Sequence, residues 1–293
     1  MSKKQGSGRT GPLGFIAKMG SKLAGFAPKV FKVLKLGKVA LAGASLASYT
    51  LIFSWQFAVV IVAVIFVHEY THVLAMKRFR MRVRGMYFIP FLGAAAVPED
   101  DFPDRKVEAV TAYAGPLTGL VLGLIGLGLF AFTHNGYVAA ITGFTAFINL
   151  FNLLPISPLD GGRVIKSVAM SIGTRFGLGF MIAGLLFLML AAYETKVLIF
   201  VILIPLGLID FLYERRGERK RLADERQHDE GMKAEPGHEL FDHKRPTVRT
   251  NLSRRAMLTV FGAYAGLAIA LFAIMLAMQH EPGAAAALHV LQG

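Results

Sequence analysis

Long apolar stretches separated by shorter charged ones make up most of the chain. Uncharged apolar runs near the length of a bilayer crossing, about 17–25 residues, lie at 39–76, 109–133, 137–156, 176–193, 197–213 and 256–279. The first run is about twice the length that one crossing needs, so it is either one bent span or two helices that turn near Ser54–Gln56. The pattern predicts an all-α polytopic membrane protein with about six or seven transmembrane helices.

One apolar segment is too short to cross a membrane. The sequence GMYFIPFLGAAAV, 85–97, has 13 residues and contains Pro90 and Gly93. A crossing helix needs more residues, and proline and glycine weaken a regular helix or a central strand. The segment therefore predicts a short re-entrant β-hairpin or loop.

Charge is distributed unevenly over the connections. The first 38 residues hold nine Lys or Arg and no acid, and the connections 77–108, 157–175 and 214–255 are basic or heavily charged, whereas 134–137 and 194–196 are nearly neutral. Cytoplasmic loops carry the excess of Lys and Arg. This asymmetry predicts a cytosolic N-terminus and favours two passes within 39–76.

The composition separates a membrane core from polar flanks. With 54% hydrophobic residues and a mean hydropathy of +0.52, the core is expected at 39–213, with a further transmembrane helix at 256–279 and a tail at 280–293. Lysines recur among apolar residues in the tail 1–38, which predicts a helix on anionic lipid, and 214–255 is a charged cytosolic linker. No nucleic-acid-binding module accounts for the net charge of +13.

The sequence HEYTH, 68–72, places ionisable groups inside the first apolar run. His68 and His72 stand four residues apart and share one helix face, while Glu69 is rotated by about 100°. This is the H-E-x-x-H arrangement of zinc hydrolases, with two nitrogen ligands and a carboxylate that can accept a proton from water. At a rise of about 1.5 Å per residue, His68 lies about 13 Å below Lys77 at the expected membrane surface. Such depth requires a partner or a wet cavity.

A zinc site of this kind needs a third protein ligand. The chain has no cysteine, and none of the remaining histidines is suitably placed. Asp160 follows the run 137–156 within FNLLPISPLDGG, where Pro155 and Pro158 interrupt the helix and two glycines permit close contacts. We therefore predict Asp160 as the third ligand. The alternatives are paired histidines without a metal and an aspartate that only caps a helix.

Three motifs, HEYTH at 68–72, AYAGPLTG at 112–119 and NLLPISPLDGG at 152–162, resemble the site-2 protease family of intramembrane zinc metalloproteases. The resemblance covers about 40–170. It implies one Zn²⁺ held by His68, His72 and Asp160, Glu69 as the general base, and Asn152 as the residue that orients substrate or stabilises the oxyanion. Thr71 stands where the family commonly has glycine. The hairpin segment is then expected near the active site, with an edge that pairs with substrate.

The resemblance predicts a zinc metalloendopeptidase that cleaves peptide bonds in or near transmembrane segments of membrane-protein substrates, as in regulated intramembrane proteolysis. We expect a multi-pass protein of the plasma (inner) membrane of a prokaryote, with its active site toward the cytosol. One alternative is a catalytically silent scaffold that binds membrane helices, against which an intact Glu69 argues. The other is a metal-ion transporter, which would need ionisable ligands along a path rather than one cluster.

Overall fold

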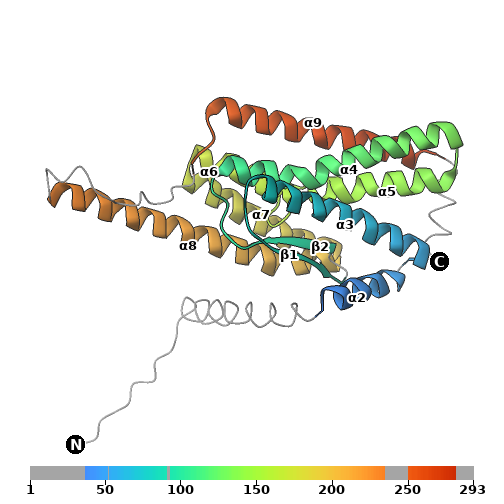
Figure 1. Cartoon of the computed structure of the whole chain (residues 1–293), viewed down its shortest axis with the longest axis horizontal. Helices are drawn as coiled ribbons and strands as arrows, with labels where there is room; N and C mark the ends of the chain where they lie inside the picture. Colours follow the sequence, from blue (N-terminus) through green and yellow to red (C-terminus); the bar gives the residue numbers. More distant parts are fainter. Residues whose placement is uncertain (1–36, 52, 91–92, 235–249, 282–293) are drawn as a thin grey trace, which may run out of the picture.

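The computed structural model describes residues 37–51, 53–90, 93–234 and 250–281. The predicted tail 1–38 lies outside this range except for its last two residues, as do 235–249 of the predicted linker and nearly all of the tail 280–293. The elements run in chain order as α2 (Lys38–Thr50), α3 (Trp55–Arg78), β1 (Val83–Ile89), β2 (Gly93–Pro98), α4 (Arg105–Thr133), α5 (Gly136–Asn152), α6 (Asp160–Ile172), α7 (Thr174–Thr195), α8 (Leu198–Ala234) and α9 (Arg254–Gln279) (Figure 1).

The first apolar run forms two helices, α2 and α3. Ser54 caps α3, because its hydroxyl accepts a hydrogen bond from the backbone N–H of Phe57 at 3.5 Å. The break therefore falls at the turn expected near Ser54–Gln56. α2 has 13 residues, which is about 20 Å of helix against a hydrocarbon core of about 30 Å.

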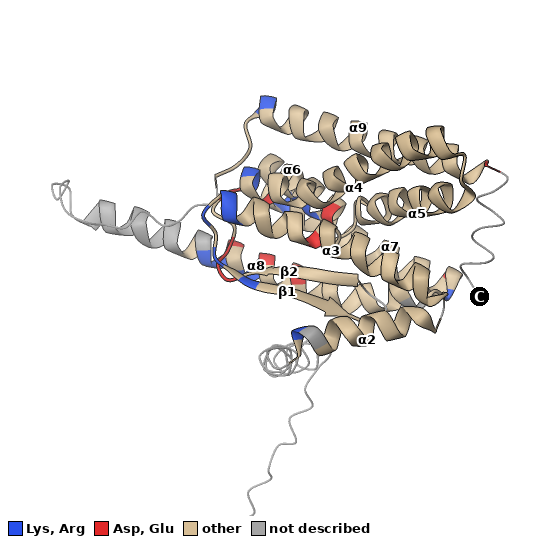
Figure 2. Cartoon of the chain, turned by 45° about the vertical axis from the view of Figure 1, so that its right-hand side comes forward, with Lys and Arg blue, Asp and Glu red and all other residues tan. Residues whose placement is uncertain are grey.

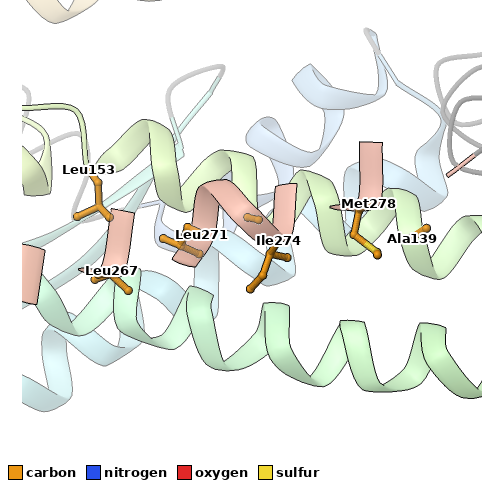
Figure 3. Close-up of a cluster of buried hydrophobic side chains, with 7 residues drawn as sticks. Ala139, Leu153, Leu267, Leu271, Ile274 and Met278 are labelled. Atoms are coloured by element: carbon orange, nitrogen blue, oxygen red, sulfur yellow. The ribbon is translucent and has the colours of Figure 1, made fainter. Parts of the chain in front are cut away.

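Helices α3, α4, α5 and α9 lie side by side and form the centre of the molecule (Figure 1). Figure 3 shows how α5 and α9 meet through a cluster of buried side chains, among them Leu153 of α5's C-terminus and Leu271, which is fully buried on α9. α7 and α8 pack against each other on the other side of α6. α9 therefore packs on the helices of the central bundle although it is separated from them by the charged segment.

Four described helices are long and apolar enough to cross a membrane: α3, α4, α7 and α9. α5 has 17 residues and no charged side chain, but it carries Asn149 and Asn152. α8 is apolar in its first part and charged afterwards. The predicted class, a helical membrane protein, is confirmed.

The short apolar segment forms the predicted hairpin. β1 and β2 pair antiparallel, with Met86 opposite Ala96 and Phe88 opposite Ala94. The hairpin lies between α3 and α2, with β2 against α3 and β1 against α2 (Figure 2). Gly93 opens β2 with a φ of 101°, a conformation that side-chain-bearing residues rarely adopt. Gly93 lies beside Ile65 of α3, so β2 begins next to the apolar part of that helix.

The charged segment after residue 213 does not begin as a separate linker. α8 continues as one helix across that boundary, and Glu214 and Glu218 are buried where they bind Arg105 of α4. Glu214 and Glu218 are buried there because the buried guanidinium of Arg105 needs carboxylate partners. Figure 2 shows most Lys and Arg at the end of the bundle where α3 ends and α4 and α9 begin.

This charge distribution predicts the orientation in the membrane, and a chain without cysteine allows a direct test. We expect a single cysteine at Asp101, beyond the hairpin, to be protected from an impermeant thiol reagent in intact cells. A cysteine at Glu194, exposed in the last turn of α7, should be labelled. The opposite pattern would show that the positive end of the bundle faces outward.

Candidate metal centre

The imidazole rings of His68 and His72, both on α3, lie next to each other. Their spacing of four residues places both on one side of the helix, and both are buried, at 3% and 4% exposure. Nε2 of His72 lies 3.1 Å from Nε2 of His68. The helix alone therefore brings two ligand atoms to one point.

Asp160 completes the group from a different part of the chain. It is the first residue of α6, and its Oδ2 lies 3.0 Å from Nε2 of His68 and 3.1 Å from Nε2 of His72. The two following glycines allow this approach. A Cβ at Gly161 would lie 2.0 Å from the carbonyl oxygen of Leu153, and one at Gly162 would lie 2.2 Å from the carbonyl carbon of Ile156. Larger residues would push α6 away from the preceding loop.

The outer nitrogen of each imidazole has a hydrogen-bond acceptor. Nδ1 of His72 lies 2.8 Å from the carbonyl oxygen of Thr111, and Nδ1 of His68 lies 2.7 Å from Oδ1 of Asn149. The amide nitrogen of Asn149 donates to the carbonyl of Thr145 at 2.8 Å, which fixes the amide orientation. In the neutral imidazoles both Nδ1 atoms therefore carry the proton, and both Nε2 atoms present a lone pair.

The resulting donor set fits a zinc ion. Two imidazole lone pairs and one carboxylate oxygen converge, with all three atoms within 4.8 Å of one another. Three acceptors without a hydrogen between them repel one another unless a cation lies among them. Zinc bonds of about 2.0–2.2 Å in tetrahedral geometry leave the fourth position open, and an N₂O set suits zinc among the common metals. Within the described part of the chain, no second group of this kind occurs.

Glu69 lies beside this group and does not belong to it. Its carboxylate is partly buried and accepts a hydrogen bond from the backbone N–H of Ala96 in β2 at 2.8 Å. Glu69, His68 and Asn152 line one cavity of about 550 Å³. The remaining lining is mainly apolar and comes from α2, α3, β2, α5 and α8, with Phe144, Phe147, Phe151 and Phe200 among its side chains.

Comparison with known proteins agrees with this geometry. The family model described as Peptidase family M50 matches residues 56–141. The chain is 28% identical over 137 residues to Zinc metalloprotease MJ0392 of Methanocaldococcus jannaschii, an alignment that covers 44% of this chain and 39% of that protein. It is 28% identical over 166 residues to Putative zinc metalloprotease Rip3 of Mycobacterium tuberculosis, with 53% and 39% covered. It is 30% identical over 104 residues to Stage IV sporulation protein FB of Bacillus subtilis, with 35% and 36% covered.

These matches support the resemblance to the site-2 protease family, although the family model covers only residues 56–141. The resemblance seen in the three motifs is thereby confirmed. The alignments span about two fifths of the length of these relatives. The family match contains α3, the hairpin, α4 and the start of α5.

Two features of this candidate metal centre do not follow from the motif spacing. Asn149 is fully buried and contacts His68, although sequence reasoning selected only Asn152 on this helix. The second feature is that two glycines of α4 leave space for the site. A Cβ at Gly115 would lie 2.4 Å from Nε2 of His68, and one at Gly119 would lie 2.0 Å from the side chain of Asn149. In the sequence, Asn149 could have been noticed as a polar amide side chain on a helix without charged residues.

Gly123, by contrast, behaves as expected for helix packing. A Cβ there would lie 3.1 Å from Ile274 of α9. Gly123 therefore makes room for α9, whereas Gly119 makes room for Asn149, whose side chain contacts His68.

Asn149 should control zinc affinity through His68. We expect Asn149→Ala to lower zinc affinity about 10–100-fold, because removing the hydrogen-bond partner of a ligating imidazole has this effect in other sites. Asn149→Asp keeps an acceptor and should retain zinc. Competition with a chelator measures both. Thr142→Ala is the matched control, since this buried residue of α5 bonds only within its own helix at 2.7 Å. Wild-type affinity in Asn149→Ala would contradict the assignment.

Proposed function

We propose that the chain is an intramembrane zinc metalloprotease that hydrolyses peptide bonds in or near transmembrane segments of membrane-protein substrates, in the manner of regulated intramembrane proteolysis. The observation that carries this proposal is the convergence of His68, His72 and Asp160 next to an apolar cavity, which His68 lines together with the carboxylate of Glu69. The names of the relatives, which include zinc metalloproteases, support the same chemistry.

Each side chain has a distinct role in this mechanism. His68, His72 and Asp160 hold the zinc ion, which when bound supplies the Lewis acidity that polarises a carbonyl and acidifies water. Glu69 accepts a proton from the attacking water and passes it to the leaving amine. Asn152, in the cavity wall, donates a hydrogen bond to the developing oxyanion.

The hairpin is proposed to hold the substrate backbone. In an antiparallel pair, successive residues direct their N–H and C=O groups alternately toward the partner strand and away from it. The N–H of Ala96 points to Glu69 and therefore away from β1. Ala94, two residues earlier, then directs its backbone groups to the same outer edge, and it lines the cavity. An extended substrate segment can pair with this edge.

The apolar lining of the cavity suits a substrate from the membrane. It is formed largely by phenylalanine and aliphatic side chains, which favour apolar side chains of a substrate over charged ones. We further propose a prokaryotic plasma membrane with the site opening toward the cytosol, supported by the charge asymmetry and by the archaeal and bacterial relatives. Anionic lipid as a partner of 1–38 stays a prediction from the sequence.

The roles of base and ligand can be separated by mutation. We expect Glu69→Gln to retain about one zinc per chain while peptide cleavage falls by at least about 10²–10⁴, the effect of losing a general base. Asp160→Ala should lose both zinc and activity. Metal analysis and cleavage of a reconstituted membrane substrate give the two readouts.

Two outcomes would contradict the enzyme assignment. If Glu69→Gln cleaved at the wild-type rate, the residue would not be the base. If metal-replete wild-type protein held no zinc, the site would not be a metal centre, and a scaffold that binds membrane helices would explain the fold better.

The edge of β2 gives a second test. Ala94→Pro removes an outward-facing N–H without removing a bond to β1, so we expect reduced cleavage with normal zinc content. Met86→Pro is the matched control, because Met86 lies opposite Ala96 and directs its N–H to the other edge of the hairpin. Equal cleavage by Ala94→Pro and the wild type would rule out substrate pairing at this edge.

A further inference from the structure

A network of buried charges joins α4, α6 and α8 outside the metal centre. Arg105 of α4 contacts Glu108 at 3.1 Å, Glu214 at 2.5 Å and Glu218 at 3.2 Å. Arg105 is 1% exposed, and its three partners are also buried. Removing one member of such a network leaves an uncompensated charge, so these residues hold the three helices in register.

Lys166 of α6 is the second cation of this network. Its ammonium group lies 3.0 Å from Glu108, 3.3 Å from Asp210 and 3.5 Å from Glu214. Burial acts to lower the pKa of Lys166, but the neighbouring carboxylates of Glu108, Asp210 and Glu214 outweigh it, and the net shift of the pKa is upward. Lys166 is therefore charged at neutral pH.

Asp210 differs from the other acids of the network because it also contacts the loop before Asp160. The buried hydroxyl of Ser157 donates a hydrogen bond to its Oδ2. Ser157 stands three residues before Asp160, and Lys166 stands six residues after it. The carboxylate of Asp210 thus contacts the chain on both sides of the predicted ligand.

The backbone of α8 approaches the same point of the loop. A Cβ at Gly207, three residues before Asp210, would lie 2.7 Å from the carbonyl oxygen of Ser157. The neighbouring Ile156 packs with Leu188 of α7 and Leu203 of α8. α7 and α8 therefore form the wall against which the ligand loop rests, and both lie outside the segment that the family model matches.

We propose that Asp210 is a positioning residue of the metal centre, which acts through the Ser157 hydroxyl to fix the turn that presents Asp160. A ligating carboxylate must be held in a narrow range of positions, and the groups that orient it influence metal affinity. The inference rests on the zinc site of the proposed function but not on the peptidase activity. α8 then helps to position a ligand of the metal centre.

Three variants separate the two contacts of Asp210. Asp210→Ala removes both the acceptor for Ser157 and the ion pair with Lys166. Asp210→Asn keeps an acceptor for Ser157 and removes the charge. Ser157→Ala removes the hydroxyl alone. The readouts are the rate of zinc loss to a chelator from the full chain in detergent and the visible spectrum of the cobalt-substituted protein, which reports ligand geometry.

We expect Asp210→Ala and Ser157→Ala each to release zinc about tenfold faster, at the lower end of the effect of outer groups on metal affinity, and to shift the cobalt spectrum. The double variant should be no faster than Asp210→Ala, because that substitution already removes the hydrogen bond that Ser157→Ala removes. Asp210→Asn should stay within about threefold of the wild type.

Glu218→Gln is the control for general loosening. Glu218 belongs to the same network but contacts Arg105 and Thr174, at 3.2 and 3.1 Å, so its variant should lower the unfolding temperature without changing zinc release. Equal zinc release from Glu218→Gln and Asp210→Ala would overturn the proposal, as would wild-type release from Asp210→Ala. Release from Asp210→Asn as fast as from Asp210→Ala would overturn the route through Ser157. A wild type without zinc would instead refute the proposed function.

Discussion

Three lone pairs directed at one point inside a bundle of apolar helices are stable only around a cation. The constraint is severe, because ionisable groups at membrane depth are costly and a buried acceptor without a partner adds to that cost. Nε2 of His68, Nε2 of His72 and Oδ2 of Asp160 lie within 4.8 Å of one another, and the Nδ1 atom of each imidazole bonds to an oxygen of the protein. Much of the surrounding structure serves to keep these three atoms in place.

This arrangement requires glycine at the points where helices and loops approach the metal centre closely. α4 passes the two imidazoles and Asn149 at Gly115 and Gly119, and α6 meets its preceding loop at Gly161 and Gly162. A polar centre that must exclude lipid is enclosed here by backbone rather than by bulky residues. Buried charges are also compensated elsewhere in the molecule. Arg105 and Lys166, at the positively charged end of the bundle, are each surrounded by carboxylates.

The sequence predicted the local part of this structure better than the long-range part. The H-E-x-x-H spacing determines the positions of His68 and His72, because an α-helix has a fixed period, and the short apolar segment with Pro90 and Gly93 correctly predicted a hairpin. Asp160 was predicted as the third ligand because the site needs one and because prolines and glycines surround this residue, and the family resemblance agreed with that choice. Asn149 was missed because its role depends on a contact with His68, which is 81 residues away. The expected end of the core at residue 213 could not be placed from the sequence either. Glu214 and Glu218 have the composition of a solvated segment, but in the structure they are buried and pair with Arg105.

Gly115 shows that an empty space can be part of a binding site. The point at which a methyl group would sit, 2.4 Å from Nε2 of His68 and 2.5 Å from Nε2 of His72, is close to where a zinc ion would bind at about 2.0–2.1 Å from each nitrogen. An alanine at this position would put its methyl group where the metal is expected and would therefore block metal binding. The metal centre therefore depends on the side chains of His68, His72 and Asp160 and equally on the absence of a side chain at Gly115.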